Sequence, residues 1–226
     1  MRTFQLIIKR CFDILVSLVI LVPFFPIWVI LALLIKCTSP GPVFFLQDRP
    51  GLHKKIFRIY KFRTMSPGSE KMVKGQEVMK DDDRITPIGK IIRKIRFDEL
   101  PQLINILRGD MTIVGPRPER PEIAEQYEKE IPSFGLRLQV KAGLTGYAQI
   151  YGRYNTEPLD KLKMDLIYIN RMSVMEDLRL IFATVKILFL PESTAGIAEG
   201  AVTAAHAEAK EKTETGAESQ KELQNT

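Results

Sequence analysis

The sequence predicts an α+β fold, in which a small mixed α/β domain follows an N-terminal membrane helix broken by proline. Three observations support this prediction. Residues Phe12 to Ile35 are nearly all apolar, and a membrane-spanning helix needs about 20 such residues. Residues Ile56 to Arg63 alternate apolar and mostly basic side chains, the pattern of a half-exposed strand. From Thr86 onward, several segments repeat apolar residues at helical spacing.

Charge divides the chain into three parts. The whole chain carries a net charge of +6, but acidic residues outnumber basic ones in 191–226, which also lacks aromatic residues. We expect this tail to be disordered. The domain expected over 39–190 is therefore strongly basic and follows the membrane segment, 1–38. A basic body indicates phosphate chemistry, nucleic acid or an anionic membrane surface.

Cysteine and histidine usage excludes several kinds of site. Cys11 and Cys37 lack metal-type spacing, which fits a reducing compartment and no disulfide framework. The only histidines are His53 and His206, too few for a zinc hydrolase or a Ser-His-Asp triad. Acid–base or nucleophilic chemistry would therefore use carboxylates, Lys, Ser or Tyr.

The apolar segment is interrupted at its midpoint. Pro23 and Pro26 bracket two phenylalanines, so a helix must kink or break there. Basic residues lie at both ends of the segment, whereas a span usually has them on one side. We expect a re-entrant helix–break–helix that enters one leaflet and returns. The alternative is a tilted, proline-kinked single span. The segment is too long for a secretory signal peptide.

A hairpin is expected after the membrane segment. Val43–Leu46 is a short predicted strand, Gln47–Leu52 a tight turn, and Ile56–Arg63 the second strand. This arrangement would bring together the three cations of the second strand, Arg58, Lys61 and Arg63.

A polar loop and a helix follow. The loop spans Met65–Asp83, and its run of Asp81, Asp82 and Asp83 could ligate a hard cation or merely solvate the loop. Thr86 and Pro87 then predict an N-cap and a first helical residue. We expect this helix to bury four isoleucines, Ile88, Ile91, Ile92 and Ile95.

Two adjacent acids, Asp98 and Glu99, come next. The residues after them are apolar at helical spacing as far as Gly109, which is a natural helix stop. Asp98 is where an N-cap belongs, and Pro101 is tolerated in the first turn. The pair is therefore either the acidic first turn of a capped helix or part of a site for anionic ligands, which a helix start attracts.

Arginines on a rigid turn form a second candidate site. After a strand expected at Met111–Val114, residues Gly115–Pro121 hold Arg117 and Arg120 among three prolines. Such a mount suits bidentate phosphate binding. A surface helix is expected over Glu122–Glu130.

The last third of the expected domain adds glycines, one more cation and two helices. The glycines of Lys141–Gln149 suggest a close backbone approach, and Arg153 lies beside aromatic residues. Lys161–Arg171 reads as an amphipathic helix that contains Asp165. Val174–Leu190 reads as another, suited equally to the membrane interface or to the core.

Taken together, four blocks of sequence resemble the bacterial sugar transferase family, in order and across about Lys9 to Leu190. These blocks are Lys9-Arg10-Cys11-Phe12-Asp13 with the broken helix, Tyr60-Lys61-Phe62-Arg63-Thr64-Met65, Asp98-Glu99-Leu100-Pro101-Gln102 with Gly109-Asp110, and Gly115-Pro116-Arg117-Pro118-Glu119. The family comprises monotopic polyprenol-phosphate phosphoglycosyl transferases, and we expect its small, minimal form. Three positions depart from the family pattern: Phe25 replaces a usual Ser, Ala142 a usual Pro, and Tyr147 a usual Trp.

The resemblance implies a re-entrant helix and interfacial helices, with a catalytic domain on the cytoplasmic face of the bacterial inner membrane. It implies transfer of a sugar-1-phosphate from a UDP-sugar to undecaprenyl phosphate, with Mg²⁺ as cofactor and membrane lipids as surroundings. By similarity, Asp98 would be the nucleophile, forming an aspartyl-phosphosugar and releasing UMP, and Glu99 would bind Mg²⁺. Other polar positions of the family site match Lys61, Arg93, Arg117 and Asp165.

The residue chemistry is compatible with that mechanism. Lys61, Arg93, Arg117 and Arg153 could stabilise charge on a transferred phosphoryl group. The same cations and the helix start should keep Asp98 ionised at neutral pH. Two alternatives are a membrane-bound glycosyltransferase that releases UDP and a membrane-anchored basic binding module. The basic residues alternate with Gly-Pro turns and carboxylates rather than forming a stripe, which argues against nucleic acid.

Overall fold

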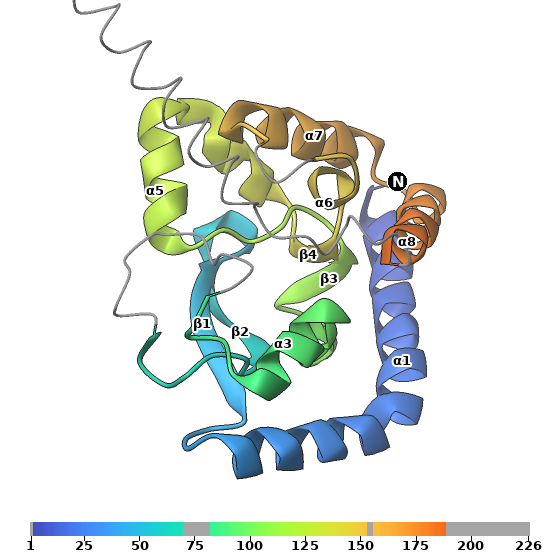
Figure 1. Ribbon diagram of the computed structural model, residues 1–226. Coiled ribbons are helices and arrows are strands. Elements are labelled where there is room, and N and C mark those ends of the chain that lie inside the picture. The colour runs from blue at the N-terminus through green and yellow to red at the C-terminus, as the bar shows by residue number, and fades with distance from the viewer. Residues whose placement is uncertain (1, 70–81, 153–155, 189–226) are drawn as a thin grey trace, which may run out of the picture. The chain divides into compact units, whose positions relative to one another are not determined.

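A computed structural model describes residues 2–69, 82–152 and 156–188. It confirms a mixed fold of helices and small sheets that begins with one long apolar helix (Figure 1). The described elements all belong to one compact unit. The elements are α1 Arg2–Thr38, β1 Phe44–Pro50, η1 Leu52–Lys54, β2 Ile56–Phe62, α3 Pro87–Lys94, η2 Phe97–Glu99, α4 Gln102–Arg108, β3 Met111–Val114, α5 Pro121–Glu130, η3 Pro132–Gln139, β4 Ala142–Thr145, α6 Tyr147–Tyr151, α7 Pro158–Arg171 and α8 Val174–Leu188.

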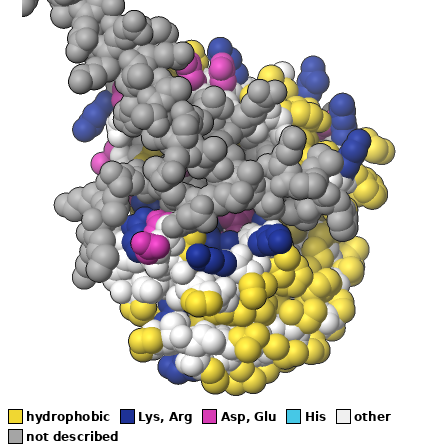
Figure 2. All heavy atoms as spheres, in the orientation of Figure 1, with side chains coloured by type: hydrophobic (Ala, Val, Ile, Leu, Met, Phe, Trp, Pro, Cys, Tyr) yellow, Lys and Arg dark blue, Asp and Glu magenta, His cyan; other side chains and the backbone are white. Residues whose placement is uncertain are grey.

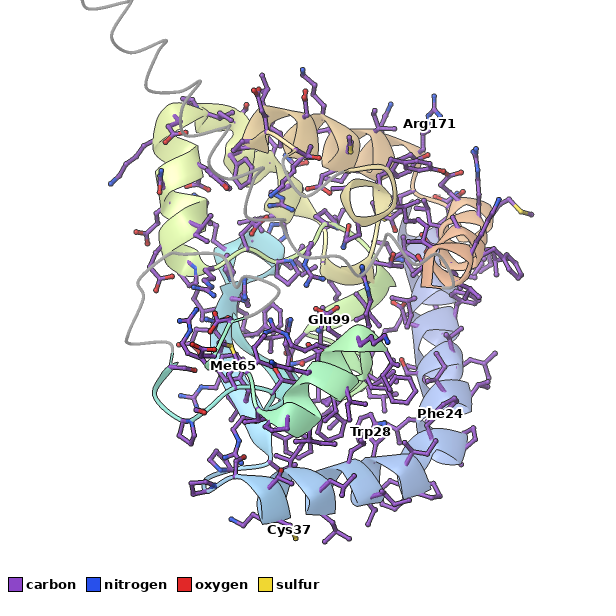
Figure 3. All side chains as sticks on the ribbon, viewed as in Figure 1. Phe24, Trp28, Cys37, Met65, Glu99 and Arg171 are labelled. Atoms are coloured by element: carbon purple, nitrogen blue, oxygen red, sulfur yellow. The ribbon has the colours of Figure 1, made fainter. Side chains whose placement is uncertain are left out.

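Helix α1 consists of two segments joined by a sharp bend (Figure 1). Pro23 and Pro26 lie inside the helix, and Phe24, between them, lies at the bend (Figure 3). Each proline removes a backbone hydrogen bond and crowds the preceding turn, which accounts for the change of direction. Among the described residues, α1 is the one helix long and apolar enough to cross a membrane. Hydrophobic side chains gather over the lower right of the surface, where Figure 1 shows α1 (Figure 2).

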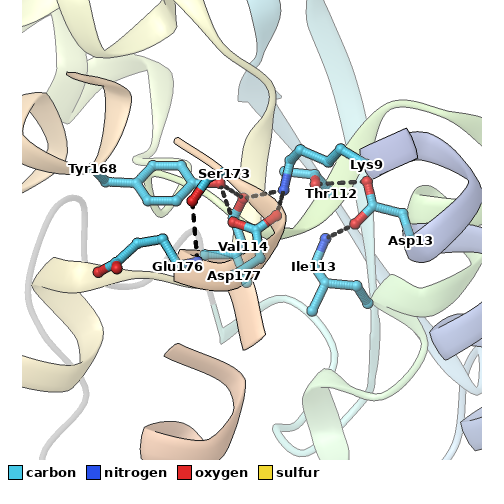
Figure 4. Close-up of polar contacts among 9 residues, drawn as sticks. All are labelled: Lys9, Asp13, Thr112, Ile113, Val114, Tyr168, Ser173, Glu176 and Asp177. Atoms are coloured by element: carbon cyan, nitrogen blue, oxygen red, sulfur yellow. Dashed lines mark hydrogen bonds and ion pairs between the residues drawn. The ribbon is translucent and has the colours of Figure 1, made fainter. Parts of the chain in front are cut away.

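Polar residues at four-residue spacing attach the first segment of α1 to the domain (Figure 4). Lys9, Asp13 and Ser17 are all buried. Lys9 Nζ donates to the Val114 carbonyl at 3.1 Å and pairs with Asp177 of α8 at 2.5 Å. The Asp13 carboxylate accepts from Thr112 Oγ1 at 2.7 Å and from the backbone N–H of Ile113 at 3.0 Å. These charged residues in the apolar segment therefore dock α1 onto β3.

The far end of α1 is attached to the same domain. The buried Arg63, just after β2, donates to the carbonyls of Ser39 and Pro40 at 2.8 Å each, and to Ser39 Oγ at 2.7 Å. Burial lowers the pKa of Arg63. Both ends of α1 thus contact one body, and the bend joins them.

The hairpin is confirmed, but its turn lies later in the chain than predicted. β1 and β2 pair antiparallel from Phe44 opposite Phe62 to Pro50 opposite Ile56. Residues predicted as a turn from Gln47 therefore extend β1, and the chain reverses between Gly51 and Lys55, where the Gly51 N–H donates to the Lys55 carbonyl at 2.9 Å.

The three cations of this hairpin do not cluster as predicted. Arg58 is exposed beside Asp48, Lys61 pairs with Glu99, and Arg63 holds the end of α1. Arg58 and Lys61 are three residues apart and therefore point to opposite faces of β2. Arg63 follows the last residue of β2 and reaches back to the chain after α1.

The second sheet supports the rigid arginine turn. β3 and β4 pair parallel, and the predicted close approach of glycines occurs here. A Cβ placed on Gly143 would lie 2.1 Å from the backbone nitrogen of Gly115. No side chain fits at that distance, so the glycine is required where the two backbones meet.

The core joins α1 to the domain, and it corrects the prediction for α3. The Trp28 ring of α1 contacts Phe62 of β2 edge-on at 5.6 Å. Thr86 caps α3 as predicted, accepting from the Gly89 N–H at 3.0 Å. Of the isoleucines predicted to be buried, Ile92 is fully buried, but Ile91 and Ile95 are 60% and 48% exposed. The apolar face of α3 is therefore only partly buried: the side of Ile92 packs on the core, and the side of Ile91 and Ile95 is exposed.

The three later helices follow the predictions, whereas η3, β4 and α6 were not predicted. α5 covers the surface helix predicted over Glu122–Glu130, and α7 and α8 cover the two later helices. The predicted tail, Asp81 and most of the loop before it lie outside the described residues. Asp82 and Asp83 are described, and no group of metal-ligating side chains is found among the residues the structure describes.

Candidate active site

Three of the predicted site residues meet at one carboxylate. Glu99 lies at the end of η2, Lys61 on β2, and Arg117 in the turn after β3. Lys61 Nζ lies 2.8 Å from Glu99 Oε1. Arg117 approaches with both terminal nitrogens, at 2.5 Å from Oε1 and 3.3 Å from Oε2. Side-chain exposures of 19% for Lys61, 20% for Glu99 and 44% for Arg117 leave this group open to solvent on one side.

These ion pairs determine the charge of Glu99. Burial alone would raise the pKa of Glu99, but Arg117 and Lys61 together outweigh burial and hold that pKa well below its usual range. Glu99 in turn raises the pKa of Arg117, against the effect of burial. Glu99 and Arg117 are therefore both charged at neutral pH.

Asp98 lies next to this cluster in a conformation that differs from the prediction. It is not the N-cap of α4. It lies within the 3₁₀ turn η2, which Arg96 enters with φ 55°, and Pro101 precedes the first residue of α4. Pro101 and the left-handed Arg96 make a tight turn that separates the acids from the helix, so the dipole argument no longer applies to Asp98.

The protonation of Asp98 is more finely balanced than predicted. Burial and the adjacent Glu99 carboxylate raise the pKa of Asp98 to about 6, although Lys61, Arg93 and Arg117 lower it. Asp98 is therefore mostly ionised at neutral pH, as predicted, but by a narrow margin. Its carboxylate accepts no hydrogen bond from the residues the structure describes, so both oxygens are available.

Arg93 approaches the acids from α3. Its positive charge lowers the pKa of Asp98. One terminal nitrogen, Nη1, is buried and has no hydrogen-bond partner among the described residues. Since a buried guanidinium nitrogen normally has a partner, this one is suited to an oxygen of a bound anion.

The turn that carries Arg117 is held by its backbone. The Gly115 N–H donates to the Thr145 carbonyl at 2.8 Å, and the Gly143 N–H donates to the Pro116 carbonyl at 2.9 Å. The next two carbonyls, of Arg117 and Pro118, accept from arginines that sequence reasoning missed. A rigid turn of this kind fixes the position of the guanidinium it carries.

Those arginines come from different elements. Arg137 in η3 donates to the Arg117 carbonyl at 2.8 Å, and Arg49 in β1 donates to the Pro118 carbonyl at 2.9 Å. Burial and the nearby Arg117 lower the pKa of Arg49 to about 10. Neither residue stands out in the sequence, because each lies singly among apolar and polar neighbours.

Asp165 reaches the site only through Arg137. The Asp165 carboxylate is 1% exposed and lies 2.7 Å from Arg137 Nη2. Burial raises the pKa of Asp165 to about 6, although Arg137 opposes the shift. Asp165 therefore orients a residue that orients Arg117, and it does not line the open side of the cluster. Arg153 lies outside the described residues.

Asn105 is a further residue that sequence reasoning missed. It is fully buried in α4, where its side chain accepts from the Tyr60 N–H at 3.0 Å and donates to the Arg58 carbonyl at 2.7 Å. This side chain pairs with the backbone of β2 as a neighbouring strand would. It thereby fixes Lys61, the next residue of β2, relative to the acids. A buried amide inside an apolar helical pattern was the available signal.

The acids can be tested for the Mg²⁺ that the resemblance implies. Mg²⁺ in proteins usually takes one or two carboxylates and completes its shell with water and substrate phosphates. Asp98 accepts no hydrogen bond from the described residues, and the adjacent Glu99 is 20% exposed, so the pair fits an ion of this type. Both Glu99 oxygens are paired with Lys61 or Arg117, and a bound ion would replace one of these contacts. The described residues offer no third carboxylate for a closed protein cage.

Comparison with known proteins identifies the family of this chain. The family model described as bacterial sugar transferase matches residues 4–191. A UDP-N-acetylgalactosamine-undecaprenyl-phosphate N-acetylgalactosaminephosphotransferase of Aeromonas hydrophila is 43% identical over 183 residues, covering 79% of this chain and 43% of that protein. A UDP-glucose:undecaprenyl-phosphate glucose-1-phosphate transferase of Escherichia coli is 41% identical over 184 residues, covering 79% of this chain and 39% of that protein.

A shorter relative is matched almost throughout. The exopolysaccharide production protein PSS of Rhizobium leguminosarum is 40% identical over 191 residues, covering 80% of this chain and 94% of that protein. The chain thus spans about two fifths of the longer relatives and nearly all of this one.

Proposed function

The chain belongs to the bacterial sugar transferase family, and from that premise we propose that it transfers a sugar-1-phosphate from a UDP-sugar to undecaprenyl phosphate. Relatives named for this reaction support the assignment. Removing glucose 1-phosphate from UDP-glucose leaves UMP, so UMP is the expected nucleotide product. The lipid product is a polyprenyl diphosphate bearing the sugar. It starts the assembly of a polysaccharide or another glycan.

One observation carries the mechanism: Asp98 is a carboxylate that accepts no hydrogen bond from the described residues and lies beside a group of fixed cations. In the first step an Asp98 oxygen attacks the phosphorus that bears the sugar. The bond from this phosphorus to the bridging oxygen breaks, and UMP leaves with that oxygen. In the second step a phosphate oxygen of the acceptor attacks the same phosphorus, and the bond to Asp98 breaks. The carboxylate is thereby regenerated.

The cations are arranged to stabilise charge on the transferred group. Lys61 and Arg117 already converge on Glu99, and Arg93, whose charge acts on Asp98, has a buried nitrogen without a hydrogen-bond partner in the part of the chain that the structure describes. Groups fixed before the reaction stabilise developing negative charge without having to reorient. Arg49 and Arg137 contribute by holding the turn of Arg117, and Asp165 by holding Arg137.

Glu99, with Asp98 beside it, would hold the Mg²⁺. When bound, the ion would neutralise charge on the diphosphate. Glu99 is suited to this role because its low pKa keeps it ionised, while the higher pKa of Asp98 reflects a carboxylate less strongly engaged by cations. The two adjacent acids would thus divide the work of attack and metal binding.

The attachment of α1 supports a re-entrant placement at the cytoplasmic face of the bacterial inner membrane. Lys9 and Asp13 dock one end onto β3, and Arg63 holds the other end. A helix that crossed the bilayer would need its ends on opposite sides. With both ends held by one polar domain and the bend exposing apolar residues, the helix can enter one leaflet and return, leaving the site at headgroup level.

Two other functions compete with this proposal. A glycosyltransferase that attacks the sugar carbon would release UDP, and it needs no carboxylate near phosphorus. A membrane-anchored basic binding module would need no catalytic acid. The pairing of Lys61 and Arg117 with Glu99 argues against a binding module, because these cations are directed at an internal carboxylate.

The decisive experiment measures the released nucleotide. Purified protein in detergent would be incubated with a panel of UDP-sugars, Mg²⁺ and undecaprenyl phosphate, with wild type and Asp98→Asn compared. We expect UMP from the wild type and a loss of roughly a thousandfold or more in kcat for Asp98→Asn, as for other covalent nucleophiles. UDP as the product, or near-wild-type turnover of Asp98→Asn, would overturn the mechanism. The panel also identifies the sugar, which differs between the relatives named above.

A further inference from the structure

The carboxylate of Glu99 occupies two of the cations that a diphosphate substrate would need. Lys61 Nζ lies 2.8 Å from Glu99 Oε1, and Arg117 approaches the same carboxylate with both terminal nitrogens, at 2.5 Å and 3.3 Å. Both oxygens of Glu99 are therefore paired with cations of the protein. Any other anion that binds Lys61 and Arg117 has to compete with this carboxylate.

The contact has the geometry in which these cations would bind a phosphate group. A guanidinium binds a carboxylate and a phosphate in the same way, with two parallel N–H donors directed at two oxygens. Lys61 adds an ammonium donor from β2 on one of those oxygens. Relative to both cations, the Glu99 carboxylate thus takes the position that a substrate phosphate would take.

The adjacent acid does not occupy the cations in this way. Asp98 accepts no hydrogen bond from the described residues, and its charge acts on Arg117 more weakly than the charge of Glu99 does. Of the two neighbouring carboxylates, Glu99 is the one that blocks Lys61 and Arg117, and Asp98 leaves them accessible.

The surroundings of this contact favour movement of the carboxylate rather than of the cations. Lys61 follows Tyr60, whose N–H is bound by the buried Asn105, and the carbonyl of Arg117 accepts from Arg137 at 2.8 Å. Glu99 ends a 3₁₀ turn of only three residues and is 20% exposed. Rotation about its side-chain bonds is enough to turn the carboxylate away, while both cations keep their positions.

We infer that Glu99 is an internal competitor for the diphosphate of the UDP-sugar: it holds Lys61 and Arg117 until it turns to a metal ion, and the two cations then bind the substrate. This inference rests on the proposed function, because it concerns the binding of the donor substrate. Both oxygens of Glu99 are paired with cations, so the same oxygens cannot bind Mg²⁺ at the same time. Mg²⁺ and the substrate should therefore each strengthen the binding of the other.

The test measures the binding of UDP, the part common to all UDP-sugars, in the absence of metal. Isothermal titration calorimetry of the purified protein in detergent with EDTA would compare wild type, Glu99→Gln and Glu99→Ala. We expect both variants to bind UDP roughly tenfold to hundredfold more tightly than the wild type, because UDP no longer has to displace a charged carboxylate from the cations. If Glu99 were only a metal ligand, its replacement would leave metal-free binding unchanged.

Asp98→Asn is the matched control for net charge. It removes one negative charge beside the same cations, but it removes no hydrogen bond to them. It should therefore strengthen UDP binding in EDTA much less than Glu99→Gln does. Equal gains in the two variants would show that net charge alone is responsible, and the inference would fail.

The converse variant tests the same competition from the side of the metal. Arg117→Met removes the guanidinium that engages both oxygens of Glu99, so Glu99 should become available to Mg²⁺ without any nucleotide. We expect the affinity for Mg²⁺ alone, measured by the same calorimetry, to rise in Arg117→Met. An unchanged affinity for Mg²⁺ would overturn the inference independently of the Glu99 variants.

A titration of the wild type in Mg²⁺ separates this inference from the proposed function. The wild type should bind UDP more tightly in Mg²⁺ than in EDTA. Absence of UDP binding in Mg²⁺ would count against the proposed function, and the inference would fall with it. UDP binding in Mg²⁺, together with unchanged or weaker binding by Glu99→Gln and Glu99→Ala in EDTA, would overturn the competition alone.

Discussion

Two clusters in this chain combine basic side chains with acidic ones, and they serve different purposes. The anchor cluster consists of Lys9, Asp177, Tyr168 and the Val114 carbonyl. The acid cluster consists of Lys61, Asp98, Glu99 and Arg117. In the anchor cluster the Tyr168 hydroxyl lies 2.7 Å from the Asp177 carboxylate and 2.8 Å from the Val114 carbonyl, so its one hydrogen can be donated to either acceptor, and Lys9 reaches both of them (Figure 4). The ammonium, the carboxylate and the hydroxyl of this cluster each have a hydrogen-bond partner.

The acid cluster is incomplete by comparison. Lys9 and Asp177 have side-chain exposures of 11% and 1%, whereas Arg117 is 44% exposed and Asp98 accepts no hydrogen bond from the described residues. Burial with full pairing produces a rigid joint. Partial exposure with an unpaired acid leaves the capacity to bind a ligand. The difference separates a structural cluster from a functional one more clearly than the residue types do.

Breaking the anchor cluster should have the largest effect on stability. Asp177→Ala leaves Lys9 buried without a counter-charge, and removing one partner of a buried ion pair costs about 3–5 kcal/mol. We expect a comparable drop in the free energy of unfolding, measured by denaturant titration in detergent. Glu128→Ala, which breaks an exposed pair with Lys54, should cost at most about 1 kcal/mol. Equal losses in the two variants would contradict the structural role of the anchor.

Loosening the turn of Arg117 should reduce catalysis more than stability. Arg137→Lys keeps a cation for Asp165, but a single ammonium group replaces the planar fork that also reaches the Arg117 carbonyl. A small displacement of a positioned group can cost about 100-fold in rate, and we expect a loss of roughly 10-fold to 100-fold in kcat with a smaller change in KM for the UDP-sugar.

The control for this variant removes the negative charge of Asp165 and leaves the Arg137 guanidinium in place. Asp165→Asn retains an oxygen that can accept from Arg137, so it should lose less activity than Arg137→Lys. A loss that appears only in the unfolding temperature, with kcat unchanged in the folded fraction, would show that Arg137 is structural alone.

Sequence reasoning predicted the helices and strands better than it predicted which of their side chains are buried. The hairpin, the capped α3, β3 and the three later helices follow from local signals such as alternation, N-cap residues and glycines. The exposed Ile91 and Ile95 were predicted to be buried, because periodicity shows which residues share a face but not what covers that face. Here one edge of that face is exposed.

The site residues that are close together in the sequence could be predicted, whereas those brought in from distant elements could not. Asp98 and Glu99 are adjacent, and Arg117 lies in a conspicuous Gly-Pro turn. Arg137 and Arg49 act on that turn from distant elements, and no local pattern predicts such contacts. The pKa of Asp98 was missed for a related reason. The expected helix start and the nearby cations predicted an Asp98 that is ionised well above its pKa. Burial and the Glu99 charge, which depend on the tertiary structure, raise the pKa of Asp98 instead.

The smallest effect expected concerns stability and pH, and it tests the contrast between the clusters directly. The pKa of Asp98 is about 6 in the folded protein and about 3.9 in an unfolded chain. A raised folded pKa means that the folded state binds the extra proton, so this group favours folding below pH 4 and loses that contribution as pH rises through 6. Asp98→Asn removes the ionised acid, and it should therefore stabilise the protein at pH 7.5 by up to about 3 kcal/mol. The advantage should shrink steadily to near zero at pH 4.

Asp165 also titrates near pH 6, but it is present in both proteins and cancels in the difference. Denaturant titrations of wild type and Asp98→Asn across this range would measure the effect. A variant that is destabilised at pH 7.5 would place Asp98 with the anchor residues, as a group held for structure rather than kept ready for reaction.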